Sequence, residues 1–325
     1  MDEHTPVLVE EALGALHIDA ETDAQRHALY VDATYGRGGH SARILQALGP
    51  RGRLLAIDRD PQAVAAARDR FAQDQRVVVV HAAFGTLESL VAAHGEGRAC
   101  RGILFDFGVS SAQLDQAQRG FSFQVDGPLD MRMDPTSGQS AAQWLAYATL
   151  DEIRDVIGTL GEERFAGRVA RAIVEARARE PITRTAQLAR IVSAAVRTRE
   201  PGKNPATRSF QALRMFVNDE LGEIERGLGA ALRVLATGGR LVAISFHSLE
   251  DRLVKNFMRR ESSPDPVLAK LPMLPPGYAP LLQLVGRKKR AGEDELRANP
   301  RSRSAILRVA ERLDTPLPAA SGGRR

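Results

Sequence analysis

The stretch LYVDATYGRGGHS, residues 29–41, decides the fold. Its first three residues are apolar and predict a short buried strand that ends at Asp32. The glycines that follow allow a tight turn, and residues 38–48 carry apolar side chains at helical spacing. A strand, a glycine-rich turn and a helix in this order are typical of the first unit of a parallel α/β sheet.

The same alternation continues through the first third of the chain. Residues 54–57 predict a second strand that ends at Asp58, and Asp60 followed by Pro61 predicts the start of a helix. Residues 77–80 are four consecutive valines, which predict a strand buried on both faces. Residues 86–94 predict a helix and residues 103–105 a fourth strand, which ends at Asp106.

The strand pattern then stops and returns only near residue 241. Between these points we expect helices, one opening at Gly161, one opening at Thr185, and one over residues 210–235. Residues 241–244, 281–285 and 305–309 predict three further strands. We therefore expect a doubly wound α/β sheet, closed by an antiparallel hairpin and interrupted by an all-helical insertion. The expected domains are 1–112 and 219–313 for the sheet and 113–218 for the insertion, with a disordered tail over 314–325.

Composition limits the class of protein. The chain has 325 residues, of which 43% are hydrophobic and 26% charged, as in ordinary globular proteins. Its single cysteine, Cys100, excludes an intramolecular disulfide framework and a CxxC zinc site. No apolar run approaches the roughly 20 residues that span a bilayer, and the first residues lack a signal-peptide pattern. We expect a cytoplasmic protein without a membrane partner.

The basic residues are concentrated in two segments. The formal net charge is +5, and residues 287–325 alone contribute +6. Nine further basic residues lie between Arg177 and Arg214. Two basic segments on a nearly neutral background favour a polyanionic partner such as a nucleic acid, although a solvated charged surface has the same composition.

The residues directly after the strands indicate the ligand, because ligands of open α/β sheets bind at the carboxyl ends of the strands. Asp58 is suited to accept hydrogen bonds from ribose hydroxyls, and Phe84 to stack on an adenine. The glycines do not fit G-x-G-x-x-G, since Ser41 occupies the last position, and no Walker pattern is present. A positively charged sulfonium suits a site with Asp32 and Asp106 better than a pyrophosphate does. The spacing favours S-adenosylmethionine over a dinucleotide.

Longer motifs, in order along nearly the whole chain, are similar to those of one family. The chain resembles the RsmH (MraW) family, the bacterial 16S rRNA (cytosine(1402)-N(4))-methyltransferases. The matching segments are HTPVL (4–8), DATYGRGGHS (32–41), DFGVSSAQLD (106–115), RGFSF (119–123), DGPLDMRMD (126–134), GEER (161–164), NPATRSFQALR (204–214), SFHSLEDR (245–252) and NPRSRS (299–304).

The resemblance implies a class I, Rossmann-like methyltransferase sheet whose helical insertion recognises the substrate. It implies N4-methylation of cytidine 1402 in the decoding region of 16S ribosomal RNA, with that RNA as part of the small ribosomal subunit. Phe107 and Ala112 stand where the family usually has Leu and Pro, but neither change removes a charge or a hydrogen-bond donor. By motif position, the cofactor contacts carried over are Gly38, Gly39, His40, Asp58, Phe84, Asp106 and Gln113.

For the RNA, the basic side chains of the insertion are expected to contact phosphates, with residues 287–290 and 301–303 as further contacts. The insertion's candidates are Arg184, Arg190, Arg197, Arg199, Lys203, Arg208 and Arg214.

The catalytic group is less defined by the sequence. Asp106 is the best candidate to orient the target amine, and the alternative is that it only holds the cofactor. His247 is either an acid–base group or a residue that shapes the target pocket. Asp126, Asp130 and Asp134 suggest a metal, but methyl transfer needs none and we expect none.

Two other functions stay open from the sequence. One is a non-catalytic RNA-binding factor in ribosome assembly, against which the intact glycine turn and Asp58 argue. The other is a methyltransferase acting on a different nucleic acid. A nucleotide-dependent oxidoreductase is disfavoured by the glycine spacing.

Overall fold

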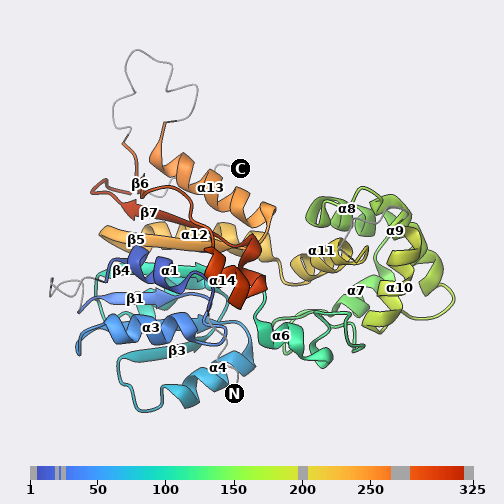
Figure 1. The fold of residues 1–325 in the computed structure, drawn as a ribbon, viewed down its shortest axis with the longest axis horizontal. Helices are drawn as coiled ribbons and strands as arrows, with labels where there is room; N and C mark the ends of the chain where they lie inside the picture. The colour runs from blue at the N-terminus through green and yellow to red at the C-terminus, as the bar shows by residue number, and fades with distance from the viewer. Residues whose placement is uncertain (1–5, 19–21, 23–26, 197–203, 265–278, 318–325) are drawn as a thin grey trace. The chain divides into compact units, whose positions relative to one another are not determined.

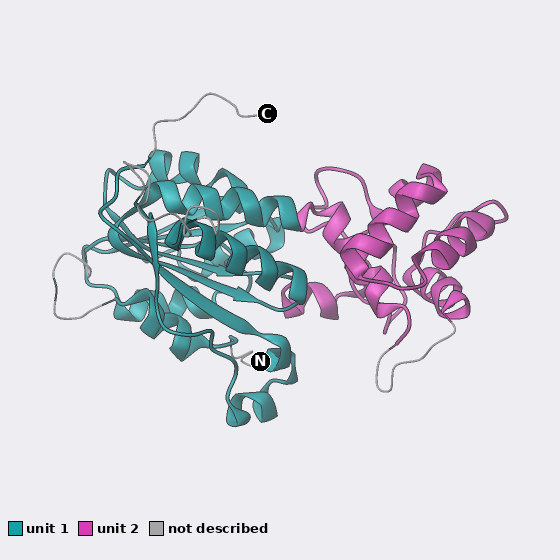
Figure 2. Cartoon of the chain, turned by 90° about the horizontal axis from the view of Figure 1, so that it is seen from above, with its two compact units in different colours: residues 1–108, 221–325 teal, residues 109–220 magenta. Residues whose placement is uncertain are grey.

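A computed structural model describes residues 6–18, 22, 27–196, 204–264 and 279–317. The chain divides into two compact units (Figure 2). Unit 1 comprises residues 1–108 and 221–325, and unit 2 comprises residues 109–220. The helical unit therefore begins after residue 108 and ends at residue 220, whereas the sequence analysis expected it to begin after residue 112 and end at residue 218.

Unit 1 contains one seven-stranded sheet in the order β3-β2-β1-β4-β5-β7-β6 (Figure 1). Strands β1 to β5 are parallel, and β7 runs antiparallel to both β5 and β6. The order reverses between β1 and β4, which is where ligands of such sheets bind. The expected doubly wound sheet with an antiparallel hairpin is confirmed. The strands are β1 (Leu29–Asp32), β2 (Arg53–Asp58), β3 (Val77–His81), β4 (Cys100–Asp106), β5 (Leu235–Ser245), β6 (Leu282–Leu284) and β7 (Ile306–Arg312).

Helices cover both faces of this sheet. On one face, Leu16 of α1 and Ile44 of α3 pack with strand residues such as Leu104. On the other, Leu228 of α12 and Val254 of α13 pack, with residues of α5, against the opposite side of the strands. Successive strand residues point to opposite faces, so each strand supplies both layers of the core. The helices of this unit are α1 (Val9–Leu16), α3 (Gly39–Ala47), α4 (Pro61–Arg70), α5 (Leu87–His94), α12 (Glu220–Val234), α13 (Ser248–Ser262) and α14 (Glu293–Ala298).

In this unit one prediction from the sequence, the start of a helix at Asp60 and Pro61, is right, and another, the burial of residues 77–80, is not. The predicted start of α4 is confirmed, because Asp60 accepts a hydrogen bond from the Gln62 backbone N–H at 3.0 Å and Pro61 is the first helical residue. The prediction that residues 77–80 are buried on both faces is wrong. These valines are only half-buried, because β3 lies at the edge of the sheet with β2 as its one neighbour.

Unit 2 is helical, and its described residues form no β-strand beyond an isolated bridge between Pro128 and Arg184. The predicted start at Thr185 is confirmed, whereas the helix predicted to open at Gly161 begins at Ala166. Gly161 instead ends the preceding helix, because Glu162 adopts a left-handed φ of 48°. Its helices are α6 (Ser111–Asp115), α7 (Ala141–Tyr147), α8 (Leu150–Gly161), α9 (Ala166–Arg177), α10 (Thr185–Ala195) and α11 (Thr207–Val217).

The helix predicted over residues 210–235 is two helices, α11 and α12, separated at Asp219, whose φ is 47°. In the part of the chain that the structure describes, no helix is long and apolar enough to cross a membrane. The described residues end at Leu317, so most of the tail predicted over 314–325 lies outside them.

Candidate active site

The turn between β1 and α3 is organised by the carboxylate of Asp32. Its Oδ1 accepts the Thr34 backbone N–H at 3.3 Å, and its Oδ2 accepts the Ser41 hydroxyl at 2.6 Å. Asp32 is 1% exposed, and burial raises the pKa of its carboxyl to about 6. Asp32 therefore acts inside the loop, where it fixes the backbone on both sides of the glycines.

The glycines of this turn leave no room for side chains. Gly38 has a φ of +73°, and a Cβ atom there would lie 2.4 Å from the Tyr35 hydroxyl oxygen. A Cβ atom on Gly39 would lie 2.8 Å from Cγ of Pro6. His40 follows in the first turn of α3 and is buried. The backbone at the start of α3 is thus held close to its neighbours, with its N–H groups at the carboxyl end of β1.

Asp58 ties the end of β2 to the same turn. Its Oδ2 accepts the Gly36 backbone N–H at 2.7 Å, and its Oδ1 accepts the Asp60 backbone N–H at 2.8 Å. Burial raises the pKa of Asp58 to about 6, and the nearby carboxylates of Asp60 and Asp32 add to this effect. Each carboxylate oxygen retains a second lone pair, so Asp58 can still accept hydrogen bonds from a ligand.

The carboxyl group of Asp106, at the end of β4, includes one buried oxygen that accepts no hydrogen bond from the described residues. Its backbone N–H donates to Thr34 Oγ1 at 2.6 Å, and its Oδ2 lies 3.6 Å from Nδ1 of His40. Its Oδ1 is buried without a hydrogen-bond partner among the described residues. Burial raises the pKa of Asp106 to about 7, which the nearby His40 opposes and the carboxylates of Asp32 and Glu250 reinforce. Because buried acceptors are almost always hydrogen-bonded, we expect a ligand to donate a hydrogen bond to this oxygen.

The two remaining predicted contacts have different surroundings. Phe84 follows β3 and is half-buried, with its ring edge-on to Phe105 at 5.4 Å and tilted against Phe107 at 5.8 Å. Gln113 belongs to unit 2, where it caps α6: its Oε1 accepts the Ser110 backbone N–H at 3.0 Å. Apart from Gln113, all the predicted cofactor contacts belong to unit 1, and its sheet brings them to the carboxyl ends of the strands. They are Gly38, Gly39, His40, Asp58, Phe84 and Asp106.

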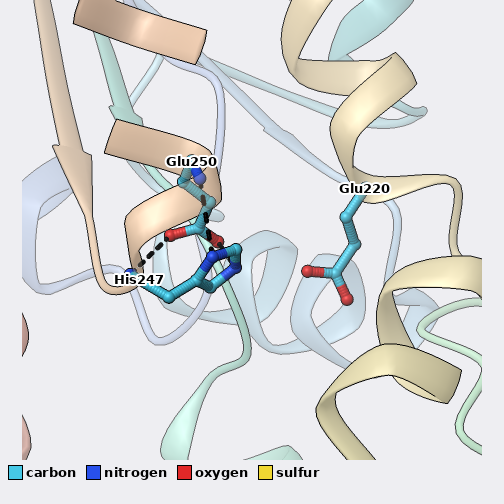
Figure 3. A group of neighbouring side chains, drawn as sticks. All are labelled: Glu220, His247 and Glu250. Carbon is cyan, nitrogen blue, oxygen red and sulfur yellow. Dashed lines mark hydrogen bonds and ion pairs between the residues drawn. The ribbon is translucent and has the colours of Figure 1, made fainter. Parts of the chain in front are cut away.

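The turn after β5 contains a group that the sequence analysis did not single out. Glu250 is fully buried, and its Oε2 accepts the backbone N–H groups of Phe246 at 2.7 Å and His247 at 3.2 Å. His247 caps α13, with Nδ1 3.5 Å from the Glu250 backbone N and Nε2 2.9 Å from Glu250 Oε1 (Figure 3). Both ring nitrogens thus face Glu250. The signal in the sequence was the capping-box spacing of three residues between His247 and Glu250.

Comparison with known proteins identifies the family. The sequence profile of the MraW methylase family matches residues 1–313. The chain belongs to the MraW methylase family. It is 53% identical over 314 residues to a Ribosomal RNA small subunit methyltransferase H of Dechloromonas aromatica, covering 95% of this chain and 98% of that protein. It is 54% identical over 311 residues to the protein of the same name from Halorhodospira halophila, covering 95% and 94%.

Solved structures match the MraW-family chain more distantly. A putative rRNA-methylase from Clostridium thermocellum aligns with a TM-score of 0.44 and 12% identity, covering 95% of this chain and 100% of that one. A putative methyltransferase from Streptococcus mutans, solved in complex with SAH, aligns with the same four values. The fold is the Rossmann-like class I methyltransferase fold with an inserted helical domain, as expected from the motifs.

The arginines of the MraW-family insertion differ in how they are engaged. Arg214 is bound by both carboxylate oxygens of Glu220 at 2.7 and 2.8 Å, and its side chain is only 15% exposed. Arg184 pairs with Asp126 at 2.6 Å, while Arg190 is exposed. Arg208 is half-buried and donates to the Glu162 carbonyl at 3.3 Å. The remaining candidates, Arg197, Arg199 and Lys203, lie outside the described residues.

The basic residues of the connection between β6 and β7 are exposed in unit 1. This applies to all of residues 287–290 and to Arg301 and Arg303. Their exposed side chains place positive charge on the surface of unit 1, which attracts polyanions.

The three aspartates of the insertion, Asp126, Asp130 and Asp134, each interact with a different neighbouring residue. Asp126 pairs with Arg184, Asp130 forms two hydrogen bonds of 2.8 Å with Arg132, and Asp134 accepts from Thr136. Glu220, also drawn in Figure 3, is likewise held by its arginine. These carboxylates are engaged locally, and we assign no metal to them.

Proposed function

We propose that this chain transfers a methyl group from S-adenosylmethionine to N4 of a cytidine in the RNA of the small ribosomal subunit, the position numbered 1402 in 16S rRNA. The observation that carries the proposal is the buried Oδ1 of Asp106 at the carboxyl end of β4, beside the glycine turn, which has no hydrogen-bond partner in the part of the chain that the structure describes. Both relatives described above are named as methyltransferases of the small-subunit ribosomal RNA, which supports the choice of RNA.

The residues at the strand ends fit this cofactor. S-adenosylmethionine supplies a methyl group on a positively charged sulfur. Gly38, Gly39 and His40 would hold its amino-acid end through the backbone at the start of α3. Asp58 would accept hydrogen bonds from the ribose, and Phe84 would contact the adenine. Buried carboxylates at the ends of β1, β2 and β4 favour a cationic ligand over a pyrophosphate.

Asp106 would contact the cofactor or the reacting amine. An exocyclic cytosine amine is a poor nucleophile, because its lone pair is delocalised into the ring. The enzyme's main task is therefore to align this nitrogen with the methyl carbon. As the nitrogen–carbon bond forms and the carbon–sulfur bond breaks, the sulfur leaves as a neutral thioether and the nitrogen becomes positive, and the nitrogen then gives one proton to solvent. An ionised Asp106 stabilises that charge by accepting a hydrogen bond from the amine.

Exposed cations would bind the RNA backbone. We assign this role to residues 287–290, Arg301 and Arg303 in unit 1 and to Arg190 in unit 2. Unit 2 would then be the substrate-recognition domain. The enzyme would act in the cytoplasm, where small ribosomal subunits are assembled.

The test is methyl transfer from labelled S-adenosylmethionine to undermethylated small subunits and, in parallel, to free 16S rRNA, followed by nucleoside analysis. Label in N4-methylated cytidine is the expected result. Label in another nucleoside, or in none while S-adenosylmethionine still binds, would contradict the proposal, and the second outcome would favour a non-catalytic RNA-binding factor. Asp106→Asn serves as the matched variant, which should bind the cofactor and lose transfer if Asp106 orients the amine.

A further inference from the structure

Phe246 occupies the turn directly after β5, next to the end of β4. Asp106 of β4 pairs in register with Ile244 of β5, so the two side chains share one face of the sheet. Phe246 follows Ile244 by two residues and packs against the core layer that contains Ile244. Its backbone is fixed, because its N–H donates to Glu250 Oε2 at 2.7 Å. The ring is half-buried, so part of it stays open to a ligand.

The loop after β4 passes beside this ring. Gly108 has a φ of +100°, and a Cβ atom there would find its nearest heavy atoms at 3.8 Å, on the Phe246 ring, and at 4.0 Å, on Glu250 Oε1. The backbone of Gly108 is therefore near the ring without being in tight contact with it. Because residue 108 is a glycine, no side chain of its own covers the ring, and the exposed part of the ring stays accessible to a flat group.

Two buried polar atoms lie at the ends of these same two strands. Asp106 Oδ1 and Ser245 Oγ are both buried and have no hydrogen-bond partner among the described residues. Ser245 is 1% exposed and directly precedes Phe246. Buried polar groups in native proteins are almost always hydrogen-bonded, so Asp106 Oδ1 indicates a ligand with a polar edge on the face that Asp106 shares with Ile244. Ser245 is one residue from Ile244 and points to the opposite face of the sheet.

The other aromatic rings near the strand ends face elsewhere. Phe84, Phe105 and Phe107 pack together in the opposite core layer, with Phe105 and Phe107 stacked at 5.4 Å. We propose that Phe246 is the ring on which the target base stacks, in a subsite completed by Gly108 and Asp106. The cofactor's adenine and the target base would then use different rings, Phe84 after β3 and Phe246 after β5.

This assignment rests on the proposed function and adds the contact that holds the base. Stacking fixes the plane of the pyrimidine, and a fixed plane sets the direction of the exocyclic amine toward Asp106. Every base has a π-face, so the ring would position the base without selecting cytosine. Selection among bases would depend on hydrogen bonds to polar atoms such as Asp106 Oδ1.

The experiment compares Phe246→Leu and Phe246→Tyr with the wild type on the RNA substrate that the wild type methylates. Phe246→Leu keeps apolar volume and removes the flat ring, so we expect kcat/KM for RNA to fall roughly 5- to 150-fold, the range measured for lost base stacking. The dissociation constant for S-adenosylmethionine should stay within twofold of the wild type. Phe246→Tyr keeps the ring and should recover most of the activity. Phe257→Leu, a buried ring in the opposite core layer, is the matched control.

Several results would overturn the assignment. Wild-type kcat/KM in Phe246→Leu would show that the ring is not needed. Weaker cofactor binding with unchanged transfer at saturating cofactor would assign the ring to the cofactor. Equal activity losses in Phe246→Leu and Phe257→Leu, with equal losses of thermal stability, would assign it to packing. If the wild type itself methylates no RNA while it binds S-adenosylmethionine, the proposed function fails first and the assignment fails with it.

Discussion

His40 joins the N-terminal segment to the end of β4 through its two ring nitrogens. Nε2 lies 3.0 Å from the carbonyl oxygen of Val7, and Nδ1 lies 3.6 Å from Oδ2 of Asp106. A carbonyl only accepts hydrogen bonds, so Nε2 carries a proton. In the neutral imidazole Nδ1 therefore presents a lone pair to the carboxyl group. The contact between Nδ1 and the carboxyl group is therefore attractive when Asp106 carries a proton.

This proton makes cofactor affinity depend on pH. The pKa of Asp106 is raised to about 7, and those of Asp32 and Asp58 to about 6, in each case mainly by burial. A cationic ligand favours the ionised carboxylates, so its binding releases protons at lower pH. We expect the dissociation constant for S-adenosylmethionine to fall as the pH rises from 5.5 to 8. Titration calorimetry in buffers of different ionisation enthalpy measures both the affinity and the protons released.

Asp106→Asn is the matched variant for this pH dependence. It should lose the part of the change that lies near pH 7 and keep the part near pH 6. A wild-type affinity that is flat between pH 5.5 and 8, with no proton release, would contradict the proposed role of these carboxylates.

The same carboxyl group should affect the stability of the ligand-free protein. Its pKa is about 7 when folded against an ordinary value of 3.8, so between these values the folded state binds more protons than the unfolded state. The contribution of Asp106 to stability is therefore complete below pH 3.8 and is lost as the pH rises through 7. Urea unfolding at several pH values should show Asp106→Asn gaining stability relative to the wild type as the pH rises from 4 to 8. A constant difference between the two proteins would contradict the shift.

The sequence predicted those features that depend on neighbouring residues. The glycine turn and the cap by Asp60 involve contacts within a few positions, and both are in the structure. The burial of residues 77–80 depends on strand order, because four valines look the same in a central strand and at an edge. The role of Glu250 required knowing that its helix starts at the end of β5, beside Gly108. The motifs propose which residues contact the cofactor, whereas the buried Asp106 Oδ1, without a hydrogen-bond partner among the described residues, is visible only in the structure.

Two arginines of unit 2 that the sequence treats alike should behave differently. Arg214 neutralises Glu220, whose side chain is 7% exposed, so Arg214→Ala leaves a buried carboxylate unpaired and should cost about 3–5 kcal/mol of stability. Arg190 is exposed, so Arg190→Ala should leave the thermal midpoint unchanged and weaken RNA binding slightly. Its effect should be recognisable as a smaller slope of log affinity against log salt concentration. Equal midpoints for the two variants would refute the structural role of Arg214.

Gly108 offers a test of the loop after β4 that separates backbone strain from lack of space. Its φ of +100° disfavours any side chain, yet a Cβ atom would meet nothing closer than 3.8 Å. Gly108→Ala should therefore cost about 1–3 kcal/mol through strain alone and lower methyl transfer by disturbing the backbone beside Asp106. Gly14→Ala is the control, because Gly14 lies inside α1 with nothing within 4 Å and alanine there should add up to about 1 kcal/mol. Chemical denaturation and transfer rates measure both variants. Wild-type stability and activity in Gly108→Ala would show that the positive φ at this position causes no strain when a side chain is added.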